Sequence, residues 1–147
     1  MTKRFVQGKH PDQSLCEDVI ATTDTHAAIF DGAGGQGQGP PGTTGARFAA
    51  TTLAAAIGDL PSDASFAEAA EQLSEALAER VLESIGGLEP SRRPFAVGVI
   101  YSAPRREIWR VGDPHFAIDG SASLGSLGIG AAPAGFRALS APLAARR

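Results

Sequence analysis

Residues 65–85 have the pattern of one long amphipathic helix, and this segment limits the possible folds more than any other. Ser65 followed by Glu68 is a capping box, in which each residue satisfies a backbone donor at the helix start. Gly86 and Gly87 end the run. Because such a helix has one apolar face, other elements must cover that face. The apolar positions recur every three or four residues: Phe66, Ala70, Leu73, Leu77, Val81 and Ile85.

The rest of the chain predicts a second helix and two sets of short strands. Residues 42–58 begin with threonines that can cap a helix and continue with small apolar side chains at helical spacing. The order of the elements predicts an α+β fold, with antiparallel sheets and both helices on one side. The expected strands alternate apolar and polar positions, and they cover residues 4–8, 18–23, 26–32, 95–103, 107–112 and 115–120.

Composition and charge exclude several classes of protein. With 147 residues, 43% hydrophobic and 20% charged, the chain predicts one compact domain. A net charge of −3 with both signs spread along the chain predicts no nucleic-acid partner and no membrane partner. A single cysteine, Cys16, allows no internal disulfide and is typical of a reducing compartment. Without a signal peptide or membrane-spanning stretch, the expected localisation is cytoplasmic.

Acidic residues are expected to meet at one end of the first hairpin. If residues 18–23 pair with residues 26–32, Glu17 and Asp18 enter one strand where Asp31 leaves its neighbour. Carboxylates and backbone carbonyls are the ligands that Mg²⁺ and Mn²⁺ prefer, and Asp31 with Gly32 offers both. Asp18 would then orient a metal-bound water. The alternative is that Asp31 and Gly32 are only a turn at a strand end.

Two motifs and their order resemble the metal-dependent protein phosphatases, the protein phosphatase 2C-like family. The stretch "LCEDVIATTDTHAAIFDGAGG" is similar to that family's Glu-Asp pair followed by a strand ending in Asp-Gly-x-Gly-Gly. The later stretch "REIWRVGDPHFAI" is similar to its strand ending in Gly-Asp-Ser-Arg. Two helices lie between these motifs in the family and in this chain, so the resemblance covers roughly residues 7–119.

The resemblance implies a four-layer α-β-β-α sandwich with a two-metal Mg²⁺ or Mn²⁺ site. It implies that Asp31 bridges both ions, that the Gly32 carbonyl and Glu17 bind one of them, and that Asp18 supports bound water. Asp113 matches an aspartate that helps hold an accessory metal in some members. The implied activity is hydrolysis of phosphoserine or phosphothreonine in a phosphorylated protein, by water that the metals activate. A partner kinase is the other expected interaction.

Departures from the family pattern keep a second function open. No arginine precedes Glu17 where the family binds phosphate, and Lys9 can replace it only as a point charge. No aspartate or glutamate follows Asp119, so the later metal ligands of the family are missing. We therefore expect a phosphatase-like domain in residues 1–120 that is incomplete at its C-terminal side. The alternative is a non-catalytic regulatory or binding domain with the same fold.

Two further segments complete the sequence-based expectations. Residues 121–147 are rich in glycine, alanine and serine, and they predict either a tail or the truncated remainder of the same domain. The glycine-rich stretch "DGAGGQGQG" also suggests a phosphate-binding nucleotide loop. That third reading is the weakest, because the stretch has no Gly-Lys-Ser or Gly-Lys-Thr after it.

Overall fold

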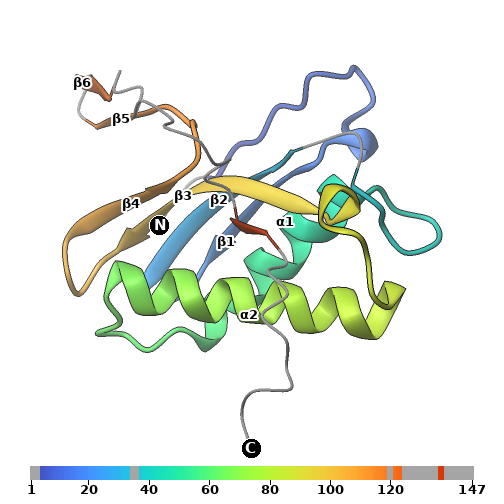
Figure 1. Ribbon diagram of the computed structural model, residues 1–147. Coiled ribbons are helices and arrows are strands. Elements are labelled where there is room, and N and C mark those ends of the chain that lie inside the picture. The colour runs from blue at the N-terminus through green and yellow to red at the C-terminus, as the bar shows by residue number, and fades with distance from the viewer. Residues whose placement is uncertain (1–3, 34–36, 119–120, 124–135, 138–147) are drawn as a thin grey trace, which may run out of the picture.

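The protein has an α+β fold in which one antiparallel sheet packs against two helices (Figure 1). The computed structural model describes residues 4–33, 37–118, 121–123 and 136–137. The main sheet has the order β1-β2-β3-β4, and the short strand β7 pairs with the first residues of β3. The α+β prediction is therefore confirmed. The strands of this sheet are β1 (Asp18–Thr22), β2 (His26–Ala33), β3 (Phe95–Ser102), β4 (Glu107–Val111) and β7 (Phe136–Arg137).

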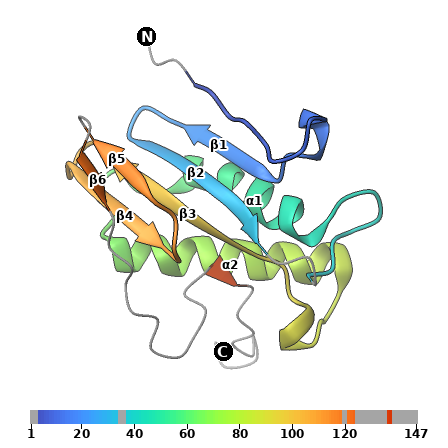
Figure 2. The ribbon, with the colours of Figure 1, turned by 90° about the horizontal axis from the view of Figure 1, so that it is seen from above.

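Both helices lie on the same side of the sheet, as expected from the order of the elements (Figure 2). Helix α1 (Gly45–Ala56) begins after the cap residue Thr44, and helix α2 (Phe66–Ile85) begins with the capping box of Ser65 and Glu68. Gly86 ends α2 with a positive φ of 81°, which glycine adopts without strain. Short 3₁₀ turns occur at η1 (Gln13–Leu15), η2 (Ile57–Asp59) and η3 (Pro90–Arg92).

The hydrophobic core fills the space between the sheet and the helices. Strand residues alternate between the two faces of a sheet, so every second residue of β2 and β3 points toward the helices. Close packing also needs small residues, because a Cβ at Gly98 would lie 2.6 Å from the Phe30 ring. The largest fully buried apolar side chains come from both layers: Phe30, Leu53, Ile57, Leu73, Leu77 and Ile100.

The other face of the sheet carries many apolar side chains but is not covered by either helix. Figure 2 looks onto this face, with α1 and α2 behind the strands. Ile29 and Tyr101 are 41% and 43% exposed here, which is unusual for large apolar side chains in a central strand. We call this side the open face; by the alternation of the strands its large apolar residues are Ile20, Ile29, Phe95, Val97, Val99, Tyr101 and Ile108.

Two expected strands differ from the structure. Residues 4–8 are irregular, so the strand predicted there is wrong. The Gly8 amide instead donates to the side-chain Oε1 of Gln13 at 3.0 Å, within a loop that leads to η1. Such local side-chain bonds compete with strand pairing. The strand expected at residues 115–120 is shorter, and it forms a separate two-stranded sheet from β5 (Phe116–Ile118) and β6 (Ser121–Ser123).

The C-terminal segment is described only in part. Residues 121–123 belong to β6 and residues 136–137 to β7, and the rest of residues 121–147 lies outside the described residues. Its reading as a tail or as a truncated remainder stays a prediction. Within the described part of the chain, no helix combines the length and apolar character needed to cross a lipid bilayer.

Candidate functional site

Two aspartates face each other across β1 and β2, at the end of the sheet where β2 terminates. The turn between these strands is closed by the Thr23 amide, which donates to the His26 carbonyl at 2.8 Å. From this turn the register pairs Asp18 directly with Asp31, as the predicted hairpin requires. Phe30 is fully buried against the helices, so its neighbour Asp31 points to the open face. Asp18 and Asp31 therefore form an acidic pair on the open face.

The environment of this pair raises the pKa of Asp31. The residue as a whole is exposed to solvent, but its carboxyl group is partly buried, and this burial is the largest cause of the raised pKa. A hydrogen bond with Asp18 and repulsion from the Asp18 charge raise the pKa further. The charge of Glu17 raises the pKa further, and the positive charge of Lys9 lowers it. Because two adjacent carboxylates resist ionising together, this position attracts a cation or a shared proton.

Glu17 is held by the first turn of α1 rather than by the acidic pair. The Thr44 hydroxyl donates to Glu17 Oε1 at 2.5 Å and accepts from the Arg47 amide at 3.1 Å. Arg47 Nη1 donates to the Cys16 carbonyl at 2.5 Å and to the Asp18 carbonyl at 3.4 Å. Sequence reasoning identified the threonines here as caps, but it missed their contact with Glu17 and it missed Arg47. No local pattern signals these contacts, because Glu17 and Thr44 lie 27 positions apart.

Gly32 has a packing role that its sequence context did not reveal. A Cβ at this position would lie 2.3 Å from the Ala46 carbonyl oxygen of α1, so only glycine lets the helix approach β2 this closely. Its carbonyl as a metal ligand stays a prediction.

The described glycines of the following loop are also close to other backbone. A Cβ at Gly45 would lie 2.3 Å from the Gly37 carbonyl oxygen, and a Cβ at Gly37 would lie 3.0 Å from the Pro94 Cα. Gly34 and Gly35, which belong to the predicted ligand-binding loop, lie outside the described residues. The small residues at 37 and 45 therefore serve the packing of this loop onto α1.

Asp113 lies apart from the other predicted site residues. It is exposed in the bend between β4 and β5. The pairing of Val111 with Gly98 places it toward the same end of the sheet as Asp31. However, β3 lies between β2 and β4, and two strand spacings amount to about 10 Å. Asp113 is not among the groups that shift the pKa of Asp31.

The two carboxylates of Asp18 and Asp31 fit one hard cation better than the expected two-metal site. Among the residues that the structure describes, no group of three or more histidine, cysteine, aspartate or glutamate side chains is placed to hold a metal ion. Asp18 and Asp31 nevertheless offer two carboxylates on adjacent strands. Mg²⁺ commonly binds through one or two carboxylates and keeps several waters. Glu17 and Asp113 would not complete this pair in the observed arrangement.

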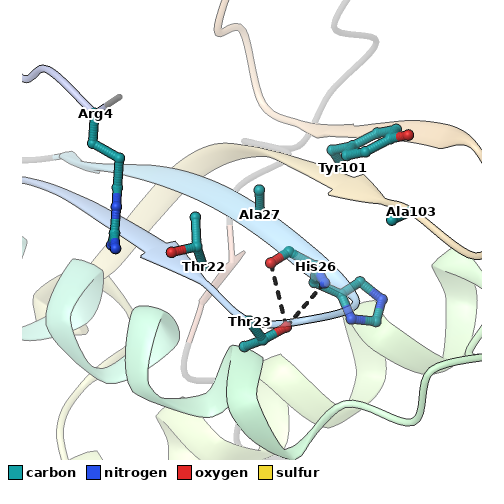
Figure 3. A pocket seen from close by; sticks show the side chains of 7 residues that line it. All are labelled: Arg4, Thr22, Thr23, His26, Ala27, Tyr101 and Ala103. Carbon is teal, nitrogen blue, oxygen red and sulfur yellow. Dashed lines mark hydrogen bonds between the residues drawn. The ribbon is translucent and has the colours of Figure 1, made fainter. Parts of the chain in front are cut away.

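A separate hollow lies at the opposite end of the sheet. Its volume is about 560 Å³, and Arg4 and Tyr101 stand on either side of it (Figure 3). Thr23 also lines the hollow, but its hydroxyl is bonded to the His26 backbone. The residue of β2 that lines the hollow and lies nearest to Asp31 is Ala27, four positions earlier, so the hollow is distinct from the acidic pair. Its complete lining is Arg4, Thr22, Thr23, His26, Ala27, Tyr101 and Ala103.

Comparison with protein-family models, with curated proteins and with solved structures found no match to this chain.

Proposed function

We propose that this chain is a phosphatase-like domain that binds Mg²⁺ or Mn²⁺ through Asp31 and acts on phosphoserine or phosphothreonine in proteins. The observation that carries the proposal is the direct cross-strand pairing of Asp18 with Asp31 on an open sheet face. Two carboxylates directly opposite each other weaken a sheet, so the presence of this pair favours a role that needs concentrated negative charge. The resemblance of the surrounding motifs to metal-dependent protein phosphatases supplies the reaction class.

Each side chain near the pair has a distinct task in the proposed reaction. A bound metal ion lowers the pKa of its water and neutralises phosphate charge. Asp31 would hold the ion as a direct ligand, and Asp18 would accept a hydrogen bond from water on that ion and so orient it. Lys9 is close enough to lower the pKa of Asp31, and its positive charge attracts the substrate phosphate.

The open face supports an incomplete α-β-β-α sandwich as the finer fold. In such a sandwich a second sheet packs about 10 Å above the first and covers its apolar side chains. Here Ile29 and Tyr101 stay largely exposed on the side away from the helices. We infer that this is the inner face of a sandwich whose second sheet the described residues do not supply.

A non-catalytic binding domain is the second candidate function. It is favoured by the absence of any three-residue metal cluster from the part of the chain that the structure describes. The sequence also has no acidic residue after Asp119 that could complete a two-metal site. Such a domain would bind a phosphorylated protein or a kinase without hydrolysing phosphate.

The two functions are separated by one assay with a matched control. Hydrolysis of a phosphothreonine peptide is measured with and without Mn²⁺, using the wild-type chain, Asp31→Ala and Asp24→Ala. Asp24 is an exposed aspartate of the same hairpin but lies in its turn, at the far end from Asp31. Activity that needs Mn²⁺ and disappears only in Asp31→Ala supports the enzyme. Peptide binding without release of phosphate supports the second candidate, and neither binding nor hydrolysis contradicts both.

A further inference from the structure

The hollow at the hairpin-turn end of the sheet has an alanine as its floor. In the register of the sheet Thr22 pairs with Ala27, and Ala27 pairs with Tyr101, so these three residues form one row across β1, β2 and β3. Directly opposed residues lie on the same face of a sheet. Because Ala27 has only a methyl group between two larger side chains, the row is lowest at its middle. The resulting volume of about 560 Å³ lies within the usual range of small-molecule sites.

The two sides of the hollow differ in polarity. Arg4 and Tyr101 stand on opposite sides of it, and the Thr22 hydroxyl points toward the Arg4 guanidinium (Figure 3). The Tyr101 hydroxyl points away from Arg4, so the tyrosine contributes mainly its ring. Ala27 and Ala103 add methyl groups on the tyrosine side. The hollow therefore has a polar end, formed by Arg4 and Thr22, and an apolar end, formed by Ala27, Tyr101 and Ala103.

The polar end carries a positive charge that the described residues leave available. Within the described part of the chain, Arg4 makes no hydrogen bond or ion pair with another residue. It is also absent from the charges that shift the pKa of Asp31. A guanidinium presents its N–H donors as a planar fork that matches the two oxygens of a carboxylate. The polar end is therefore suited to an anionic group.

The wall at the hairpin turn is built by the protein's own hydrogen bonds. The Thr23 hydroxyl oxygen accepts from the amides of His26 and Thr25 at 2.9 and 3.2 Å. The Ala103 amide donates to the Thr25 carbonyl at 2.9 Å, which ties the end of β3 to the same turn. This part of the hollow needs no ligand to form, and such preorganisation lowers the entropy cost of binding.

We propose that the hollow binds a small aromatic carboxylate. The carboxylate pairs with Arg4 and accepts a hydrogen bond from Thr22, and the ring lies over Ala27 against Tyr101. Thr22 and Tyr101 are two strand spacings apart, about 10 Å. A flat ring between them needs about 7–8 Å, because each of its faces contacts a neighbour at about 3.5–4 Å. The inference does not rest on the proposed function, since the hollow shares no residue with the acidic pair.

The test is a calorimetric titration of the full chain with three probes, benzoate, benzamide and acetate. Benzamide has the ring of benzoate without its charge, and acetate has the charge without the ring. We expect benzoate to bind at least about tenfold more tightly than either, because only benzoate fills both ends and forms charge-assisted hydrogen bonds.

Three variants locate the binding in the hollow. Arg4→Gln removes the positive charge, and Ala27→Val fills the floor with a residue that strands favour, so the fold should be kept. Each should weaken benzoate binding about tenfold or more. Arg80→Gln is the matched control, because it removes the same charge from an exposed arginine of α2, on the other side of the sheet. Its affinity for benzoate should equal that of wild type.

A spectroscopic readout checks the position of the ring. Benzoate should shift the methyl resonances of Ala27 and Ala103 through its ring current and leave those of Leu82, which is exposed on α2, unchanged. Absence of saturable benzoate binding would overturn the proposal. Equal affinity for benzoate and benzamide, or equal weakening by Arg4→Gln and Arg80→Gln, would overturn it as well.

Discussion

The two faces of the main sheet are built from the same strands, but their side chains are covered to different extents. The face toward the helices is closed, with Phe30 and Ile100 at 0% and 1% exposure. The open face, one residue further along each strand, leaves Ile29 and Tyr101 at 41% and 43%. It also carries the acidic pair of Asp18 and Asp31. Stability therefore comes from one face, and the groups suited to chemistry lie on the other.

This division explains how repelling carboxylates can be tolerated. Leu53, Leu73 and Leu77 are fully buried between the helices and the covered face. Burial of each such side chain stabilises by about 1.5–3 kcal/mol, which exceeds the typical cost of a like-charge cross-strand pair. The core on one side thus offsets the unfavourable contact on the other.

The largest difference between the faces should appear on truncation of neighbouring residues in β2. We expect Phe30→Ala to lower the free energy of unfolding by about 3–5 kcal/mol, because it leaves a cavity in the core. Ile29→Ala removes a side chain that is already 41% exposed, and it should cost less than half as much. Urea unfolding measures both values. Similar losses would mean that the open face is covered in solution.

A smaller effect is expected where α1 meets the sheet. Gly32→Ala would place a Cβ 2.3 Å from the Ala46 carbonyl oxygen, which forces the helix away and should cost about 1–3 kcal/mol. Gly58→Ala is the control, because a Cβ there meets nothing within 4 Å. That change should be neutral or stabilising by up to about 1 kcal/mol. A neutral Gly32→Ala in thermal unfolding would contradict the close contact.

The covered face should lose stability in mild acid because of His26. This residue is 2% exposed, and burial lowers its pKa below the usual 6.5. The folded state therefore prefers the neutral ring, so its contribution is present above pH 6.5 and is lost as the pH falls toward the lowered pKa. His26→Phe cannot titrate, and its stability should decline less below pH 6.5. Parallel pH curves for wild type and His26→Phe would contradict this assignment.

The contribution of the open face to stability should change with pH in the opposite direction, and we expect it to be the smallest of the effects predicted here. The raised pKa of Asp31 means that the folded state binds its proton more tightly than the unfolded state does. Its stabilising contribution is present below 3.8 and is lost as the pH rises through the raised pKa. Asp18→Asn removes the repulsion, so it should stabilise the metal-free protein at pH 7 by about 0.2–1 kcal/mol. Destabilisation measured by urea unfolding would show that the pair is not strained.

Local patterns in the sequence were enough to predict several elements. The capping box at Ser65 and the glycine at 86 predicted α2, since these signals act within a few residues of the helix ends. The short turn after Thr23 also determines the register that places Asp18 opposite Asp31. The α+β class follows from these two features together.

Contacts between distant segments could not be predicted in this way. Arg47 reaches the carbonyl of Cys16, 31 positions earlier, and nothing in the local sequence marks that partner. Gly32 looked like part of a ligand-binding turn, whereas its closest neighbour is the backbone of α1. The strand expected at residues 4–8 failed for a related reason, because strand formation depends on a pairing partner as well as on the alternating pattern.

The central claim is a cation site at Asp18 and Asp31. Its most direct test is a calorimetric titration of the metal-free protein with Mn²⁺, in which Asp31→Asn is compared with the control variant Asp24→Asn. The proposed site predicts binding by wild type and by Asp24→Asn, and loss of binding in Asp31→Asn. Failure of wild type to bind Mn²⁺, or equal affinity in all three proteins, would contradict a cation site at Asp18 and Asp31.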